Sequence, residues 1–554
     1  MLLTVGTKNK FTLIPLGGLG ERGKNMMVLE TDRDIVVIDC GLMNPEEELL
    51  GIDFVIPDVS YLLENRDKVR GIILTHGHDG HIGALPYLLK QLSIPVFGTD
   101  MTLGVAAMKL REAGLSTEVL RRVNPGERFS LGTFKVEPVS VSHTLPGAVA
   151  VVVSTPCGRV LHTGDFHFDQ TPPNNNFTDI HRLAELGREG VFLLLSDSTN
   201  SEVPEFSPSE KENIGAIRNI LRSAKGRVIM IGYGANLYRL EQAVAAAADM
   251  GRRTNVAWPE GRELLNLAQQ MGHLSFPEES FFDPRNEQVA PEEQVIVVPD
   301  FETLEPVAGI RADGRTTVPV QAGDTVVLVA SPGPGSEKRV ARNIDNLFKV
   351  GAEVYPELTS WPHPFGHASR EELKLMLNLV QPRYFVPIHG EFRTLVWHAR
   401  IAQQVGIPEE NIFVVENGTS IEFTPDKARL GNRITAGKVL VDGLGVGDVG
   451  NIVLRDRKQL SQDGILIVVV TLDKQKGQVV AGPDIVSRGF VYVREAEELL
   501  EEAKDKVRQA LEKCETSRAT EWATIKSQVR DTLGKFLFER TRRRPMILPI
   551  IMEI

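Results

Sequence analysis

Residues 75–81 read Thr75-His76-Gly77-His78-Asp79-Gly80-His81 and directly follow the apolar run GIIL at 71–74. That run predicts a β-strand that ends where the histidines begin. Imidazoles two positions apart just past a strand can converge on one metal ion, while a third further along the turn can face a second ion. The whole chain has only 12 histidines, so three in one turn need a reason. The stretch therefore predicts a metal site at a strand end.

Three later residues repeat this pattern at the ends of other apolar runs. His143 follows VEPVSVS, Asp165 follows RVLHTG, and His389 follows YFVPI. A lone histidine or aspartate in such a place is usually only a turn residue. Because separate strands can deliver their ends to one edge of a sheet, we expect these three residues to join the histidines at 76–81.

Size and composition indicate a multidomain globular protein. Its 554 residues suggest about three domains. The three cysteines have no CxxC spacing, which argues against a disulfide framework and a thiolate zinc site and favours a reducing cytoplasm. The net charge of -11 argues against coating nucleic acid by bulk electrostatics, although it allows a narrow basic channel. No apolar run reaches the roughly 20 residues of a membrane span, so we expect no membrane partner.

The order of predicted elements changes along the chain. Short β-branched runs dominate residues 1–208 and predict two packed sheets with helices outside, including a helix over 101–122. Helices and strands alternate over 209–360, which is typical of an inserted α/β domain with a parallel sheet. Strand-like and site-like features return over 361–430, and a glycine-rich linker follows at 431–456. A small α+β domain is predicted over 457–554.

The order of the candidate residues resembles the metallo-β-lactamase superfamily. The matching positions are Asp39 in IVVIDCG, the histidines at 76, 78 and 81, His143 in VSHT and Asp165 in HTGDF. The segments SDSTN, GHAS and PIHGE, with Asp197, His367 and His389, resemble its nucleic-acid-processing branch, called β-CASP. IPLGGLGERGKNM, SPGPGSEKRVARNIDNL and VDGLGVGDVGN resemble bacterial ribonuclease J. The resemblance spans nearly the whole chain and implies an α/β fold, an αββα sandwich with an inserted β-CASP domain.

This resemblance implies a site for two divalent cations, with Zn2+ expected and Mn2+ or Mg2+ as alternatives. The implied ligands are His76, His78 and His143 for one cation, His81 and His389 for the other, and Asp165 as a bridge. Two cations so held clamp a phosphodiester and lower the pKa of a shared water toward neutrality. Asp39 is implied as a supporting residue that holds the ligand loops in place.

Catalytic and substrate-binding residues also follow from the resemblance. Asp197 and His367 are implied to assist proton transfer to the leaving group or to orient the substrate. The residues implied to bind substrate phosphates are His363, Gly366, His367, Ala368, Ser369 and Asn236. A glycine-containing turn offers backbone N–H groups, to which serine and histidine add side-chain donors. Ser369 is interpreted equally well as a helix cap that forms a capping box with Glu372, and the two roles are compatible.

The histidine stretch departs from the family pattern at one position. The pattern is His-x-His-x-Asp-His, whereas this chain has Gly80 in the fifth position and an acid, Asp79, one residue earlier. The missing carboxylate would normally bind the second cation, and an acid moved by one residue in a tight turn is redirected. Asp79 is therefore a tentative ligand, and occupancy of the second site stays open.

The implied function is a metal-dependent ribonuclease of RNA processing and decay. It would combine 5′-to-3′ exonuclease and endonuclease activity, prefer 5′-monophosphorylated RNA, and form homodimers or homotetramers, with an RNA-decay complex as a partner. Two alternatives stay open. One is a small-molecule hydrolase of the same superfamily, against which the inserted domain argues. The other is a scaffold that binds RNA without cutting it, which Gly80 supports.

Two further motifs have competing interpretations. The stretch GLGERG at 18–23 fits the dinucleotide-binding pattern G-x-G-x-x-G, but the residues after it predict strands rather than the required helix. We therefore expect a hairpin loop near the active site. The basic run RTRRR at 540–544 could contact RNA, although pairing with the acidic helix at 495–506 is the favoured interpretation.

Overall fold

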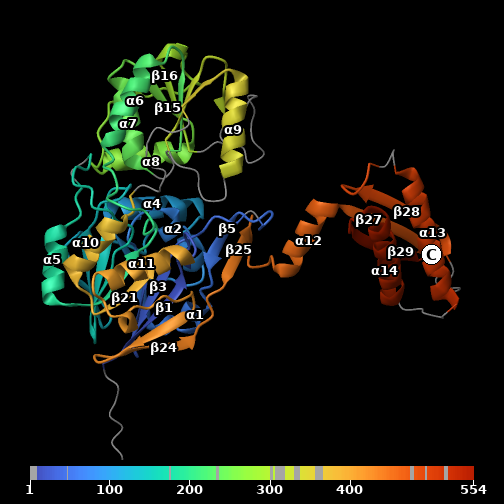
Figure 1. The fold of residues 1–554 in the computed structure, drawn as a ribbon, viewed down its shortest axis with the longest axis horizontal. Coiled ribbons are helices and arrows are strands. Elements are labelled where there is room, and N and C mark those ends of the chain that lie inside the picture. The colour runs from blue at the N-terminus through green and yellow to red at the C-terminus, as the bar shows by residue number, and fades with distance from the viewer. Residues whose placement is uncertain are drawn as a thin grey trace, which may run out of the picture. The chain divides into compact units, whose positions relative to one another are not determined.

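The computed structural model describes most of the chain. The residues it describes are 9–46, 48–173, 176–232, 236–299, 304–305, 318–329, 337–355, 366–473, 479–492, 496–516 and 522–553. The chain forms two compact units, one of residues 1–43 and 56–438 and the other of residues 44–55 and 439–554. Figure 1 labels their helices and strands.

An eight-stranded mixed sheet is the first layer of the larger unit. Its strands, in spatial order, are β24 (Ala428–Arg433), β23 (Thr419–Phe423), β1 (Phe11–Gly17), β3 (Met26–Glu30), β4 (Ile35–Ile38), β6 (Val69–Ile73), β7 (Val96–Gly98) and β8 (Leu120–Arg122). β4, β6, β7 and β8 run parallel to one another. The C-terminal ends of β4 and β6 therefore lie at one edge, from which Asp39 and the histidine stretch continue.

A six-stranded sheet is the second layer. Its strands, in spatial order, are β21 (Tyr384–Ile388), β13 (Val191–Asp197), β12 (Gly158–His162), β11 (Val149–Thr155), β10 (Phe134–Ser140) and β9 (Phe129–Leu131). β12, β13 and β21 are parallel neighbours, so their C-terminal ends also share one edge. Apolar residues of both sheets, such as Leu13, Val36, Val151 and Leu193, form one buried cluster between the layers.

Helices cover the outer faces of the two sheets, which completes the αββα sandwich (Figure 1). α1 (Ser60–Glu64), α2 (Asp79–Ile82), α3 (Leu85–Leu89) and α4 (Asp100–Glu112) are connected to strands of the first sheet. α5 (Ile180–Glu189), α10 (Arg370–Val380) and α11 (Phe392–Gln404) pack on the second sheet. Leu183, Leu377 and Ile401 of these three helices share a buried cluster with Val152 and Leu194 of the sheet.

The inserted segment forms its own parallel sheet, as its alternating pattern predicts. The strand order is β15 (Arg253–Val256), β16 (Gln294–Val298), β14 (Val228–Ile231), β19 (Thr325–Leu328) and β20 (Glu353–Tyr355), and every neighbouring pair is parallel. Its helices are α6 (Glu212–Ser223), α7 (Leu237–Ala248), α8 (Pro259–Gln270) and α9 (Glu337–Val350). A further short pair, β17 (Leu304–Glu305) and β18 (Val318–Pro319), is also parallel. The segment is thus an α/β domain within the sandwich sequence.

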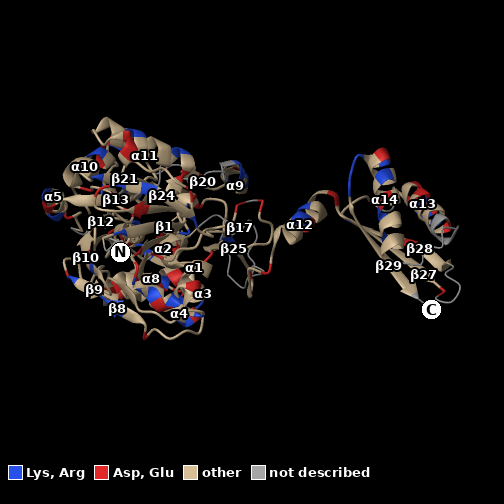
Figure 2. Ribbon diagram, turned by 90° about the horizontal axis from the view of Figure 1, so that it is seen from below, with Lys and Arg blue, Asp and Glu red and all other residues tan. Residues whose placement is uncertain are grey.

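The smaller unit contains an α+β fold. α12 (Asn451–Asp463) precedes a sheet of β28 (Val479–Arg488), β27 (Ile465–Leu472) and β29 (Met546–Glu553), with α13 (Glu497–Thr516) and α14 (Trp522–Thr541) packed on it. Figure 2 colours both acidic and basic positions along the ribbons of these two helices. In the basic run, Arg540 forms an ion pair with Glu502, and Arg543 Nη1 donates to Phe490 O at 2.8 Å. The predicted pairing with the acidic helix is therefore confirmed.

The helix predicted over 101–122 is too long: α4 ends at Glu112, Gly114 has φ of 69°, and residues 120–122 form the edge strand β8. A glycine in the left-handed region is a common helix terminator, and this one stops α4.

The glycine-rich stretch GLGERG at 18–23 leads through β2 (Leu19–Gly20) into β3 and opens no helix. The dinucleotide-binding alternative is therefore wrong.

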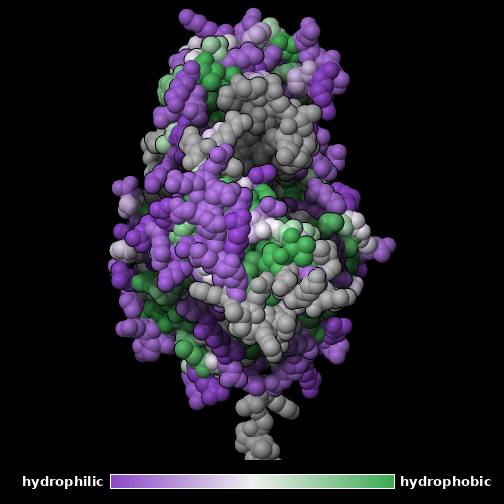
Figure 3. Space-filling view, turned by 90° about the vertical axis from the view of Figure 1, so that its right-hand side faces the viewer, coloured by the Kyte–Doolittle hydropathy of each residue, from purple (hydrophilic) through white to green (hydrophobic). Residues whose placement is uncertain are grey.

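The described residues on the face in Figure 3 are mainly hydrophilic, and the hydrophobic ones form limited patches. Among the helices of the described residues, none combines the length and the apolar character that crossing a bilayer requires.

Candidate metal centre

The candidate residues come together because strands of both sheets end at one rim. His76 and His78 lie just beyond β6, and His81 lies in α2. Asp165 follows β12, Asp197 is the last residue of β13, and His389 follows β21. As these last three strands are adjacent and parallel, the residues after them meet at one edge. The predicted convergence of His143, Asp165 and His389 with the histidine stretch is thus found in the structure.

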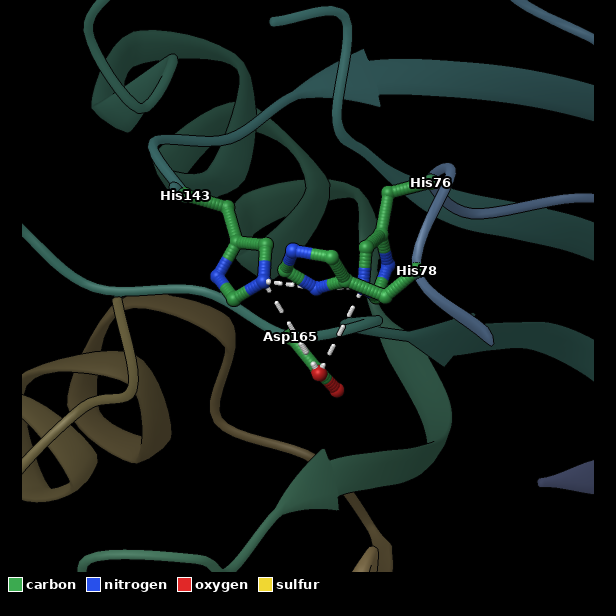
Figure 4. A group of neighbouring side chains, drawn as sticks. All are labelled: His76, His78, His143 and Asp165. Atoms are coloured by element: carbon green, nitrogen blue, oxygen red, sulfur yellow. Dashed lines mark hydrogen bonds and ion pairs between the residues drawn. The ribbon is translucent and has the colours of Figure 1, made fainter. Parts of the chain in front are cut away.

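A first group of potential metal ligands consists of His76, His78, His143 and Asp165 (Figure 4). His78 Nδ1 lies 3.0 Å from both His76 Nε2 and His143 Nε2. Asp165 Oδ2 lies 3.6 Å from His76 Nε2 and 4.0 Å from His143 Nε2. A tetrahedral shell with ligands at about 2.1 Å places its ligand atoms about 3.4 Å apart. The separations bracket this value, so these residues fit a divalent cation.

The ring orientations in this group are held by hydrogen bonds on the opposite nitrogens. His143 Nδ1 donates to Gly366 O at 2.7 Å, and His76 Nδ1 lies 3.0 Å from Thr75 Oγ1. Such contacts fix the ring of a metal-binding histidine and leave the other nitrogen for the metal. Burial also holds the pKa of His76 and of His143 well below the usual range. Both imidazoles are therefore neutral, which is the form that binds metals.

Asp165 is the shared residue at the centre of the site. Its Oδ1 accepts from His389 Nδ1 at 2.6 Å, and its Oδ2 lies 3.2 Å from His81 Nε2 and 4.0 Å from His367 Nε2. Burial would raise the pKa of Asp165, but the surrounding histidines, His389 foremost, outweigh it and hold the pKa well below the usual range. The residue is a carboxylate that can bridge two cations.

Asp39 is hydrogen-bonded to both ends of the histidine stretch. Its Oδ2 accepts from His81 Nδ1 at 2.7 Å, and its Oδ1 accepts from the backbone N–H of Thr75 at 2.8 Å. Burial would lower the pKa of His81, but the carboxylates of Asp165 and Asp39 outweigh it and raise the pKa to about 10. Asp39 thus contacts the first and the last residue of the stretch, where a loop-holding residue is expected.

A second group of potential ligands shares Asp165 and adds Asp197, His367 and His389. His367 Nδ1 donates to Asp197 Oδ2 at 2.7 Å. Burial would lower the pKa of His367, but Asp197 and Asp165 outweigh it and raise the pKa. The residues expected to be catalytic therefore form a hydrogen-bonded pair beside the bridging carboxylate.

Asp79 lies away from both groups. Its carboxylate pairs with Lys109 Nζ at 2.5 Å, its side chain is 55% exposed, and it belongs to neither group of ligands among the described residues. Asp79 and His81 are two positions apart in α2, about 200° around the helix axis, so the two side chains point in nearly opposite directions. The tentative assignment of Asp79 as a ligand is not supported.

The residues expected to bind phosphate divide into two kinds. Gly366 and His367 lie at the metal centre, as the contact of Gly366 O with His143 shows. Ser369 is fully buried and forms the capping box with Glu372, and Ala368 is also buried. Asn236 is buried, and its side chain caps α7 and donates to Glu210. His363 lies outside the described residues.

Sequence reasoning missed Asn25. Its Nδ2 donates to Gly80 O at 3.0 Å and lies 3.1 Å from His81 Nε2. An asparagine in a glycine-rich stretch is usually a turn residue, so the sequence carries no signal for this contact. Only the fold brings residues 25 and 81 together.

Four family models match consecutive parts of the chain. They are the Metallo-beta-lactamase superfamily at 19–199, the Ribonuclease J beta-CASP domain at 225–347, the Zn-dependent metallo-hydrolase RNA specificity domain at 363–415 and the Ribonuclease J C-terminal domain at 452–554. The chain is 43% identical to Ribonuclease J2 of Bacillus subtilis (strain 168) over 98% of both chains. The chain belongs to the ribonuclease J family. Ribonuclease J 2 of Staphylococcus aureus (strain NCTC 8325 / PS 47) is 38% identical over 99% of both chains.

A solved structure is similar to the fold of this ribonuclease J family member. It is a protein of unknown function from Enterococcus faecalis V583, with a TM-score of 0.51 and 17% identity, covering 75% of this chain and 100% of that one. Membership of the ribonuclease J family, together with the paired ligand groups, supports a metal-dependent ribonuclease. It favours neither the small-molecule hydrolase nor the scaffold alternative.

Proposed function

We propose that the chain cuts RNA by metal-assisted hydrolysis of phosphodiester bonds, with Zn2+ as the expected cation and Mn2+ or Mg2+ as alternatives. The observation that carries this proposal is the convergence of three imidazole nitrogens and one carboxylate oxygen, from His76, His78, His143 and Asp165, at separations of 3.0 to 4.0 Å. Such a donor set suits zinc and other divalent cations of hydrolytic sites. The ribonuclease J family supplies the substrate class.

Cations held by these residues would lower the pKa of a bound water and neutralise charge on the reacting phosphate. The side chains of the protein set the protonation states and the orientations that this chemistry requires. Burial keeps His76 and His143 in the neutral form, and Asp165 stays ionised among its histidines. Asp197 holds His367 so that its Nε2 is directed toward Asp165. Of the two roles expected for the Asp197–His367 pair, we propose that it orients the reacting phosphate.

The turn at Gly366 is proposed to lie along the phosphate backbone of the bound RNA. Gly366 has φ of 78°, and a Cβ there would lie 2.7 Å from His143 Nδ1, so only glycine allows this close approach to the ligands. His363 and His367 stay proposed phosphate contacts. Ser369 and Asn236 are not proposed, because both side chains are buried and bonded within the protein.

The finer properties of the activity rest on the resemblance to ribonuclease J. They are combined 5′-to-3′ exonuclease and endonuclease activity, a preference for 5′-monophosphorylated RNA, and assembly into homodimers or homotetramers that join an RNA-decay complex. We also propose that residues 1–208 and 361–430 form the metallo-β-lactamase domain and 209–360 the β-CASP domain. Residues 431–456 would then be a linker, and residues 457–554 the C-terminal domain.

The proposal is tested with the full-length protein, three RNAs of one sequence and added Zn2+, Mn2+ or Mg2+. Loss of a 5′-monophosphorylated linear RNA as mononucleotides reports the exonuclease, and opening of a circular RNA reports the endonuclease. A 5′-triphosphorylated RNA should resist the first activity. Asp165→Asn should abolish both activities, whereas the matched control Asp79→Asn on the surface should keep them. The proposal fails if the wild type cuts none of the RNAs with any of the three cations.

A further inference from the structure

We propose that Arg22 binds a phosphate of the RNA backbone other than the one that is cut. This inference rests on the proposed function, because it takes RNA as the substrate and the metal centre as the place of cleavage. Arg22 lies in the glycine-rich stretch GLGERG at 18–23, which opens no helix and contributes no candidate metal ligand. An arginine suits this role, since its planar guanidinium matches the geometry of phosphate oxygens.

The backbone on either side of Arg22 lies against the metal centre. The residue before Arg22 forms a β-bridge with Gly390, which directly follows His389. Three positions after Arg22, the backbone N–H of Asn25 donates to Gly80 O at 3.0 Å. Arg22 is therefore placed between the strand end that carries one candidate ligand and the turn that carries the histidine stretch.

The loop that carries Arg22 is fixed by its neighbour Glu21. Glu21 Oε1 accepts from Asn417 Nδ2 at 2.8 Å and from the backbone N–H of Gly18 at 3.2 Å. The same oxygen pairs with the buried Lys24 Nζ at 2.9 Å. Because the loop is already ordered, little backbone freedom is lost when Arg22 binds a ligand.

The guanidinium of Arg22 has a donor that the protein does not use. Its Nε is buried and has no hydrogen-bond partner among the described residues. Glu391 Oε1 lies 3.4 Å from Nε, which makes an ion pair without the geometry of a hydrogen bond. The side chain is nevertheless 30% exposed. Since buried donors are normally satisfied, this arrangement fits an acceptor that arrives from solution.

The neighbouring Arg393, by contrast, is bound within the protein. Its Nε donates to Glu202 Oε2 at 2.9 Å, and its Nη1 donates to Glu391 Oε2. Burial and the repulsion by Arg393 lower the pKa of Arg22, although Asp197 of the metal centre acts in the opposite direction. The guanidinium is thus within electrostatic reach of the site, and an anion bound to it would offset the repulsion.

The bound phosphate is a neighbour of the reacting one. In the proposed function the reacting phosphate is held at the candidate ligands and oriented by His367. RNA carries a phosphate on every nucleotide, so a strand cut at the metal centre has further phosphates beside it. Arg22 projects from the loop that borders the centre and would bind one of these without taking part in the bond cleavage.

The inference is tested with the full-length protein and Mn2+ by binding and by kinetics. Binding of a phosphorothioate oligoribonucleotide, which resists hydrolysis, is measured by fluorescence anisotropy over a series of KCl concentrations. Arg22→Gln should weaken binding by about tenfold. The slope of log K against log salt should shrink by about 0.7, the contribution of one phosphate contact in a single strand. In cleavage, KM should rise with kcat little changed, because the contact is equal in the ground and transition states.

Three further variants separate this role from others, with thermal unfolding as a check that each is folded. Arg22→Lys keeps the charge and should keep most of the salt slope. Glu391→Gln removes the carboxylate beside Arg22 and should not weaken binding. Arg429→Gln is the matched control, because Arg429 also pairs with a glutamate but lies on β24, which β23, β1, β3 and β4 separate from β6. It should bind RNA like the wild type.

The outcomes are distinguishable. An Arg22→Gln protein with the wild-type affinity and salt slope would overturn the inference. An equal loss in Glu391→Gln would also overturn it and assign Arg22 to support of the loop, and an equal loss in Arg429→Gln would reduce the effect to net charge. A wild type that neither binds nor cuts RNA would instead overturn the proposed function.

Discussion

The two sides of the metal centre start from one short stretch of chain and differ in what fills them. On one side, His76 and His78 meet His143 and Asp165 with ligand atoms spaced for a cation. On the other side, His81 Nε2 lies 3.1 Å from Asn25 Nδ2 and 3.2 Å from Asp165 Oδ2, and Gly80 supplies no carboxylate. The two sides therefore differ at one position of the histidine stretch, Gly80.

The largest expected effect comes from the residue that the two sides share. Asp165→Asn removes the carboxylate that faces His76, His81, His143, His367 and His389. Hydrolysis of RNA should fall by at least about a thousandfold, because loss of even one electrostatic stabiliser costs on the order of 10² to 10³. Rates measured at saturating Mn2+ check this. A variant that keeps a tenth of the wild-type rate would show that Asp165 is not central to the site.

Asp39→Asn tests whether Asp39 contributes to the stability of the fold without contributing to metal binding. Replacing the acceptor of the His81 Nδ1 proton and the Thr75 N–H should lower the free energy of unfolding by about 2 to 3 kcal/mol. Mn2+ should still bind at the group of His76, His78, His143 and Asp165, because the hydrogen bonds of Asp39 are to Thr75 and His81. Chemical denaturation and metal analysis measure the two quantities on one sample. Loss of all bound Mn2+ with the fold intact would contradict this prediction.

A smaller, pH-dependent effect is expected at His398, which is buried and has Nδ1 3.0 Å from Ser198 Oγ. Burial lowers its pKa to about 3. The unfolded chain then binds more protons than the folded one between pH 3 and the ordinary value near 6.5, so stability falls as pH drops through that window. At pH 5 the cost is about 2 kcal/mol. His398→Gln should flatten the pH dependence of unfolding between pH 5 and 7, and an unchanged slope would remove His398 as a cause.

The smallest effect is expected on the surface of α2. Asp79→Asn breaks the exposed ion pair with Lys109, and such pairs contribute under about 1 kcal/mol. RNA cleavage and Mn2+ stoichiometry should match the wild type. A clear drop in bound metal would restore Asp79 as a ligand and remove the contrast between the two sides.

Much of the first side could be predicted from the sequence. Strand ends carry His76, His143 and Asp165, and parallel strands deliver them to one edge, so an apolar run followed by a ligand residue is an informative local pattern. His389 follows the same local pattern, whereas Asp39 and Asp197 followed from the resemblance. All three lie at the same edge.

The second side could not be predicted in the same way. The contact of Asn25 with His81 joins residues 56 positions apart and depends on hydrogen-bond geometry that no local pattern records. The direction of Asp79 depends on where α2 begins, a boundary that sequence patterns locate only to within a few residues. The end of α4 could not be predicted either, because an isolated glycine such as Gly114 is tolerated inside a helical pattern, and only its positive φ makes it a terminator.

The most direct measurement is anomalous diffraction at the manganese edge from crystals of the full-length protein soaked in Mn2+. Our account predicts a peak at the first group of ligands, within bonding distance of His76, His78, His143 and Asp165. The absence of a peak there would contradict it.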